Sequence, residues 1–265
     1  MLKRNNVTIE GDGATTLVFS HGFGSDQSVW GQVADWAVKK YRVVRFDLMG
    51  SGMTKPGDFD RARYDSLQGY ADDLLTILQK TGTERCIYVG HSVSGMIGLL
   101  AGIARPHLFE RMILLAASPR YLNDGDYVGG FEKEDLTNLF DAINANFREW
   151  ATNFAPHVIG ADIDDPLVKD FASGMLRMQP DIALTMALMI FTSDLREELP
   201  KLEVPSLILQ SRNDIAVPMA VAHYLHARLS NSQLGVIEAD GHLPHITAPH
   251  LVIAAIERYL EETLR

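Results

Sequence analysis

The segment Cys86-Ile-Tyr-Val-Gly-His-Ser-Val-Ser-Gly95 is the most informative stretch of the chain. It begins with an apolar, strand-like run and leads into a helical pattern rich in glycine and alanine. A serine between a buried strand and a helix, here Ser92, lies on a tight turn that exposes its hydroxyl above the sheet. The usual pattern is Gly-x-Ser-x-Gly. Here Gly90 provides the first glycine, whereas Ser94 replaces the second and Gly95 follows one place later.

Short apolar runs alternate with helical patterns on both sides of this segment. The strand-like runs are apolar at nearly every position: Thr16–Ser20, Tyr41–Asp47, Cys86–Gly90, Met112–Ala116, Ser206–Gln210 and Leu234–Glu238. The helix-like segments are Val29–Lys39, Leu67–Gln79, Val93–Ala104, Met219–Leu229 and His250–Leu264. Strands buried on both faces have this composition in parallel sheets covered by helices. We therefore predict an α/β fold with a mostly parallel, doubly wound sheet, and an edge hairpin at Val7–Glu10.

No strand-like run occurs between Tyr121 and about Glu198. Four helical patterns fill this region: Glu132–Asn146, Arg148–Ala155, Pro166–Met178 and Asp181–Thr192. The region is too long for a loop and too short for a second core. We predict a core of residues 1–120 and 199–265 with a helical cap of residues 121–198. Ligands of open α/β sheets bind beyond the carboxyl ends of the strands, so this cap would cover the site.

Composition excludes several classes of partner. The 265 residues include 24 Lys plus Arg and 34 Asp plus Glu, so the net charge is 24 − 34 = −10. An acidic chain has no long-range attraction for nucleic acid or anionic lipid. The single cysteine, Cys86, cannot form an internal disulfide, which fits a reducing compartment. Residues 1–6 precede no apolar stretch, and the longest apolar run, 96–104, is too short to span a bilayer. We predict a cytoplasmic protein.

A serine nucleophile needs a base and a group that orients the base. On a sheet of this type the order along the chain is serine, acid and histidine, each at the end of a later strand. Asp214 follows the strand-like run 206–210, and His242 follows the run 234–238. We therefore predict that Asp214 orients His242 and that His242 takes the Ser92 proton.

Two nearby residues compete for these roles. His245 lies three residues after His242, but Gly241 favours His242 because it provides the tight turn. Asp240 lies on the same loop as the histidine, so chain order favours Asp214. No third ligand stands at metal-binding spacing from the two histidines, and the chain is predicted to use no metal or cofactor.

Acyl transfer also needs hydrogen-bond donors for the developing oxyanion. The glycine-rich stretch His21-Gly-Phe-Gly24 directly follows the strand-like run 16–20. We assign the two donors to the backbone N–H groups of Phe23 and Val93.

Several longer stretches carry a resemblance to one group of α/β-hydrolases. They are His21–Trp30, Gly90–Gly98, Ser118–Asp124, Gly129–Phe131, Phe154–Pro156, Arg177–Ile182, Ser193–Arg196 and Gly241–His245. In these stretches the chain resembles the bacterial stress-signalling hydrolase RsbQ and the plant karrikin and strigolactone receptors. The resemblance spans nearly the whole chain, cap included.

The resemblance implies a V-shaped cap of four helices over a deep, mostly apolar pocket. The family's pocket residues correspond to Phe23, His91, Tyr121, Trp150, Phe154, Phe191 and Ile215. Its ligands are small esters, enol ethers or lactones, butenolides among them, which are turned over slowly and with a signalling output. Plant members carry an asparagine within the segment that corresponds to Phe46–Gly52, and their cap helix is less bulky than Leu184–Ile190. These departures favour a bacterial-type member with a ligand other than strigolactone. Ser94 matches the plant type instead, so the resemblance leaves the subgroup open.

Two functions follow from these predictions. The first is a serine hydrolase that acts on a small ester or lactone. The second is a sensor whose ligand-bound or acylated state engages a protein partner, a phosphatase in RsbQ-like systems. The stretch Asp124-Gly-Asp-Tyr127 is predicted to be an exposed acidic and aromatic surface for such a partner.

Overall fold

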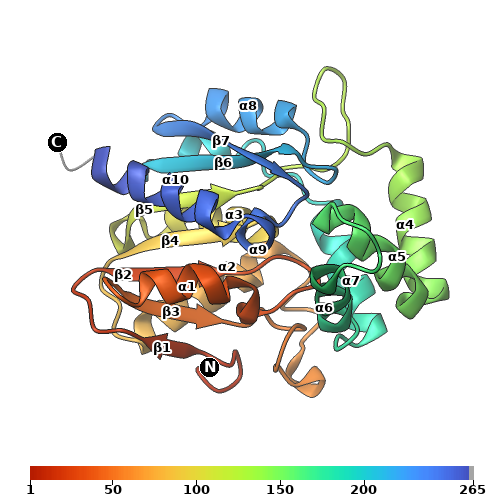
Figure 1. The fold of residues 1–265 in the computed structure, drawn as a ribbon, viewed down its shortest axis with the longest axis horizontal. Helices are drawn as coiled ribbons and strands as arrows, with labels where there is room; N and C mark the ends of the chain where they lie inside the picture. The colour runs from red at the N-terminus through yellow and green to blue at the C-terminus, as the bar shows by residue number, and fades with distance from the viewer. Residues whose placement is uncertain (263–265) are drawn as a thin grey trace.

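A computed structural model describes residues 1–262 and contains a seven-stranded sheet (Figure 1). The strands are β1 (Thr8–Glu10), β2 (Thr16–Ser20), β3 (Arg42–Phe46), β4 (Cys86–His91), β5 (Phe109–Leu115), β6 (Ser206–Asn213) and β7 (Ser232–Asp240). Their order is β1-β3-β2-β4-β5-β6-β7, and only the pair β1–β3 is antiparallel among these strands. The prediction of a mostly parallel α/β sheet is confirmed.

The predicted edge hairpin is wrong. β1 pairs with β3 and not with β2, the strand that follows it. β2 is buried at every residue and pairs with β3 on one side and β4 on the other, so neither of its edges is free.

Helices cover both faces of the sheet. On one face lie α1 (Gly31–Ala37), preceded by the 3-10 turn η1 (Gln27–Trp30), and α10 (Pro249–Glu262); on the other lie α2 (Leu67–Lys80), α3 (Val93–Ala104) and α8 (Met219–Arg228). Successive residues of β2 enter different cores: Leu17 and Phe19 pack on the α1 side, and Val18 packs on the α2 side. β2 is therefore apolar at consecutive positions. Residues 263 and 264 of the predicted last helix lie outside the described residues.

Four helices follow one another between β5 and β6. They are α4 (Lys133–Ala145), α5 (Phe147–Ile159), α6 (Pro166–Met175) and α7 (Pro180–Phe191). α5 packs against α6, and α4 packs against α7. Figure 1 shows the group beyond the carboxyl ends of the parallel strands, where the sequence predicts a cap. The remaining short elements are η2 (Pro56–Asp58), η3 (Pro106–Leu108), η4 (Leu199–Lys201) and α9 (Pro244–Thr247).

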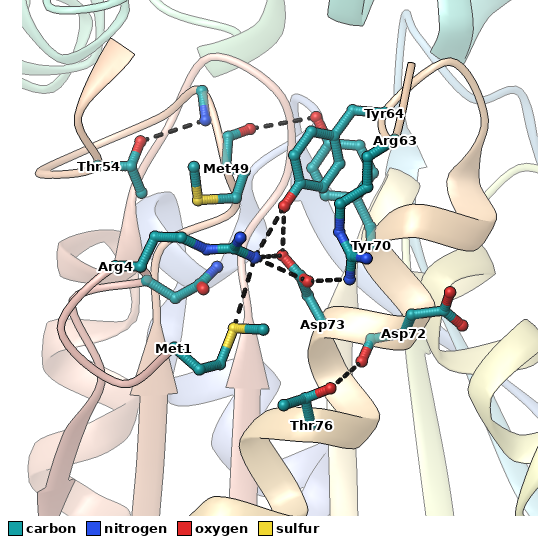
Figure 2. A network of polar contacts seen from close by, with 12 residues as sticks. Met1, Arg4, Met49, Thr54, Arg63, Tyr64, Tyr70, Asp72, Asp73 and Thr76 are labelled. Atoms are coloured by element: carbon teal, nitrogen blue, oxygen red, sulfur yellow. Dashed lines mark hydrogen bonds and ion pairs between the residues drawn. The ribbon is translucent and has the colours of Figure 1, made fainter. Parts of the chain in front are cut away.

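A buried carboxylate on α2 ties the N-terminal segment to the β3–α2 connection (Figure 2). Asp73 accepts hydrogen bonds from Arg4, Arg63 and the Tyr64 hydroxyl, the last at 2.6 Å. Burial raises the pKa of Tyr64, so its hydroxyl remains a donor. This network holds three segments together around one charge, because a buried carboxylate without such partners would be strongly destabilising.

Candidate active site

Ser92 occupies a strained turn between β4 and α3. Its backbone has φ 56° and ψ −124°, a left-handed φ that non-glycine residues rarely adopt. The turn is held because the Ser92 N–H donates to the Leu115 carbonyl at 2.8 Å. A Cβ at Gly90 would lie 2.5 Å from the Ser94 carbonyl oxygen, so the turn requires glycine there. Strain of this kind is concentrated at functional sites.

The structure brings the three residues of the predicted triad together. Ser92 Oγ lies 2.9 Å from His242 Nε2, and His242 Nδ1 lies 2.8 Å from Asp214 Oδ2. All three residues are buried. This is the hydrogen-bonding order that a nucleophile, a base and an orienting acid require.

Backbone and side-chain donors fix the Asp214 carboxylate. Oδ1 accepts from the N–H groups of Ala216 at 2.9 Å and Val217 at 3.0 Å. Oδ2 accepts from Gln210 Nε2 at 3.1 Å in addition to His242. Because its two oxygens face these donors, the carboxylate can turn only by breaking hydrogen bonds.

The loop that carries His242 rests on the end of α5. The His242 N–H donates to the Val158 carbonyl at 2.6 Å, and Gly241 has φ +84°. A Cβ at Gly241 would lie 2.3 Å from the Ile159 carbonyl oxygen. Sequence reasoning explained Gly241 by the tight turn alone and missed its contact with α5. A helix of the predicted cap thus positions the predicted base.

His245 and Asp240, the alternatives for the base and the orienting acid, lie outside the hydrogen-bonded chain Ser92–His242–Asp214. His245 is buried and stacks on Trp30 with ring centroids 4.4 Å apart. Asp240 is exposed and accepts from Asn213 Nδ2 at 2.8 Å.

The predicted oxyanion donors come from two backbones that meet at Ser92. A Cβ at Gly22 would lie 3.1 Å from Ser92 Cβ, so the loop that leads into Phe23 passes directly beside the serine. Val93 is the first residue of α3, and N–H groups in the first turn of a helix lack intrahelical partners. The assignment of Phe23 and Val93 as donors remains a prediction.

A small cavity of about 30 Å³ adjoins Ser92. It is lined by Phe23, His91, Ser92, Tyr121, Phe154, Val158, Phe171, Ile190, Phe191, Ala216, His242 and Leu243. The Tyr121 hydroxyl lies 3.4 Å from Ser92 Oγ, and burial raises the pKa of Tyr121 to about 12, which keeps this hydroxyl protonated. The cavity is apolar, as the resemblance implies, but its volume is about that of two water molecules.

Two of the seven predicted pocket residues do not reach this cavity. Ile215 is 63% exposed, although it lies next to Asp214 in sequence. Trp150 does not line the cavity. It stacks on Phe154, which does, with ring centroids 4.9 Å apart. Sequence reasoning missed the lining residues Val158, Phe171, Ile190, Ala216 and Leu243. They carry no signal that separates them from other buried apolar residues.

The prediction of an exposed acidic and aromatic surface at Asp124–Tyr127 is correct for Asp124 and wrong for Tyr127. Asp124 is exposed and pairs with Arg196. Tyr127 is buried, because its hydroxyl donates to the Arg120 carbonyl at 2.8 Å and the Arg196 guanidinium covers its ring.

The chain belongs to the alpha/beta hydrolase family, whose model matches residues 17–255. It is 48% identical to the karrikin insensitive 2 receptor CA of Petunia hybrida, over 98% of this chain and 97% of that protein. It is 41% identical to the strigolactone esterase D14 of Arabidopsis thaliana, over 98% and 97% of the two chains. A solved hydrolase from Oleispira antarctica superposes with a TM-score of 0.94 at 34% identity, covering 98% of this chain and 96% of that one.

These relatives confirm the predicted family and identify the chain as an α/β hydrolase. Within residues 1–262, no helix is long and apolar enough to cross a membrane.

Proposed function

We propose that the chain hydrolyses small esters, enol ethers or lactones, such as butenolides, through an acyl-enzyme on Ser92. The observation that carries this proposal is the continuous chain of hydrogen bonds Ser92–His242–Asp214 beside an apolar cavity. The apolar walls favour an uncharged substrate.

In the first half-reaction, His242 Nε2 takes the Ser92 proton while Oγ bonds to the carbonyl carbon. The negative charge on the carbonyl oxygen is met by the N–H groups of Phe23 and Val93. The bond to the leaving oxygen then breaks, and that oxygen takes the proton from His242. In the second half-reaction, water attacks the acyl carbon, His242 takes a proton from it, and Ser92 Oγ leaves with that proton.

The groups around His242 bear on the imidazolium that forms when it takes a proton in each step. Asp214 accepts from Nδ1 and stabilises the imidazolium. The nearest histidine rings, His91 and His245, stay neutral because burial, followed by the neighbouring histidines, lowers the pKa of each. They therefore add no positive charge that would oppose proton uptake by His242.

The test compares Ser92→Ala with Ser230→Ala, an exposed serine between α8 and β7. Both variants are mixed with a butenolide enol-ether probe, and product and intact mass are followed. Ser92→Ala should lose product formation and any acyl adduct, whereas Ser230→Ala should match the wild type. Hydrolysis that survives Ser92→Ala unchanged would contradict the proposal. A lasting adduct on the wild type indicates slow deacylation, and product without an adduct indicates ordinary turnover.

A second candidate function is ligand sensing. The receptor name of a relative at 48% identity supports it, and so does the contact between α5 and the His242 loop. Acylation of Ser92 would displace His242, and the Val158–His242 hydrogen bond would transmit that shift to α5. Amide hydrogen exchange with and without the probe tests this idea, with Ser92→Ala as the control. Exchange in α4–α7 that the probe leaves unchanged would count against it, as would a partner, phosphatase-type or other, that binds equally well without the probe.

A further inference from the structure

Ser94 stands where the usual Gly-x-Ser-x-Gly pattern has its second glycine, and its side chain is fully buried. Its Oγ donates to the backbone carbonyl of His21 at 2.5 Å and lies 2.8 Å from the Oγ of Ser20. A carbonyl oxygen only accepts, so the Ser94 proton points to His21, and Ser20 donates its own proton to the Ser94 Oγ. The hydroxyl therefore makes two hydrogen bonds that a glycine at this position could not make.

The partners of Ser94 belong to the end of β2 and to the loop that follows it. β2 and β4 pair as far as Ser20 and Gly90, and their ladder ends there. His21 is the first residue beyond that last pair. The Ser94 hydroxyl therefore joins the loop that leads into Phe23 to the first turn of α3, at a point where the ladder no longer holds the two segments together.

The His21 side chain fixes the orientation of the next peptide group. The Leu48 N–H donates to His21 Nε2 at 3.0 Å, and burial lowers the pKa of His21, so the ring is neutral with its proton on Nδ1. Nδ1 donates to the Gly22 carbonyl at 2.8 Å, and the Ser25 hydroxyl donates to the same oxygen at 2.9 Å. A trans peptide is planar with its N–H opposite its C=O, so these bonds also fix the direction of the Phe23 N–H.

The Ser94–His21 hydrogen bond lies close to both N–H groups that are assigned to the oxyanion. Val93 directly precedes Ser94 in the first turn of α3, and Phe23 follows His21 by two positions. The two donors come from separate segments of the chain, so their spacing depends on contacts between those segments. Small errors in such a spacing matter, because a misplacement of about 1 Å can cost about a hundredfold in rate.

We propose that Ser94 is a positioning residue for ester hydrolysis: its hydroxyl holds the first turn of α3 against the His21 carbonyl and so sets the spacing of the Val93 and Phe23 N–H groups. This inference rests on the proposed function and on the two donors assigned there. Ser94 is fully buried and is absent from the lining of the Ser92 cavity. It therefore acts through the backbone donors, which stabilise the oxyanion more than the substrate carbonyl.

Turnover of 4-nitrophenyl acetate by Ser94→Ala tests the proposal, with Ser206→Ala as the matched control. Ser206 is also buried, and its hydroxyl donates to the Val204 carbonyl at 2.9 Å at the start of β6, away from the carboxyl ends of the strands. Each variant thus removes a buried hydroxyl that binds a backbone carbonyl. Ser94→Ala should lower kcat and kcat/KM by the same factor, at least about tenfold, because it weakens an interaction made only in the transition state. Ser206→Ala should leave both unchanged.

A ligand that forms a stable oxyanion measures the same donors without turnover. With 1,1,1-trifluoroacetone, Ser92 Oγ bonds to the carbonyl carbon, His242 takes the Ser92 proton, and the carbonyl oxygen becomes an alkoxide. The affinity of this adduct, followed by fluorine NMR, should be at least about tenfold lower in Ser94→Ala than in Ser206→Ala. The pH profile of kcat/KM should keep its midpoint in Ser94→Ala, because the hydrogen bonds of Ser94 lie outside the triad.

Equal kinetics and equal adduct affinity in the two variants would overturn the proposal, and so would a raised KM at unchanged kcat, which reports ground-state binding. A shifted midpoint in the pH profile would also overturn it, because the substitution would then act on His242. If the wild type hydrolyses no ester, the proposed function fails, whereas the adduct affinities still decide the role of Ser94. A wild type that forms neither product nor adduct overturns both.

Discussion

Replacing Asp214 by asparagine tests the role of the carboxylate in orienting His242. At the Oδ1 position, the N–H groups of Ala216 and Val217 are fixed donors at 2.9 and 3.0 Å, so the amide oxygen must face them. The amide NH2 then takes the Oδ2 position and faces His242 Nδ1. Two donors cannot share that contact, so Nδ1 becomes the acceptor and the proton moves to Nε2.

In this tautomer His242 cannot accept the Ser92 proton. A tautomer change of this kind costs about 10⁴-fold in kcat, or about 5.4 kcal/mol of transition-state stabilisation at 1.36 kcal/mol per tenfold. The assay is kcat/KM on 4-nitrophenyl acetate. The matched control is Asp240→Asn, which removes the same charge from an exposed residue on the His242 loop and should change the rate less than about twofold. A rate for Asp214→Asn within tenfold of the wild type, with Tm unchanged, would refute the assigned role.

Three further predictions concern stability. Gly241→Ala should lower Tm by at least about 2 °C in thermal melting, because left-handed backbone costs about 1–2 kcal/mol in an L-residue and the new Cβ meets Ile159. Burial lowers the pKa of His245 to about 3, so the unfolded chain binds more protons below pH 6.5. Stability should therefore fall from pH 6.5 toward pH 3, by at most about 1.4 kcal/mol per pH unit from this group, and His245→Phe should flatten that slope in urea titrations. Asp73→Ala should cost about 3 kcal/mol because it leaves two arginines without their carboxylate, whereas the exposed neighbour Asp72→Ala should cost little.

Local patterns were sufficient to predict most of the sheet and the residues that meet above it. The run at 16–20 coincides with β2, and the other runs overlap the remaining parallel strands. Parallel strands carry their active residues at one edge, so chain order alone brought Ser92, Asp214 and His242 into one prediction.

The pairing of β1 and the lining of the cavity depended on contacts that no local pattern encodes. β1 pairs with β3 and not with β2, the next strand in sequence, because β3 and β4 already occupy the two edges of β2. Trp150 on α5 and Phe171 on α6 are both aromatic, yet only Phe171 reaches the cavity beside Ser92. Which face of each helix reaches the cavity depends on how the helices pack on one another and on the sheet.

The sequence by itself therefore determined the class of fold, the family and the order of the predicted triad, because these follow from residue periodicity and from motifs within single elements. Tertiary structure alone decided how the end of α5 holds the His242 loop, how small the cavity beside Ser92 is and that the Ser94 hydroxyl meets the His21 carbonyl. The physical reason is that cavities and interhelical hydrogen bonds arise between side chains and backbones distant in sequence, where close packing and not local periodicity sets the spacing.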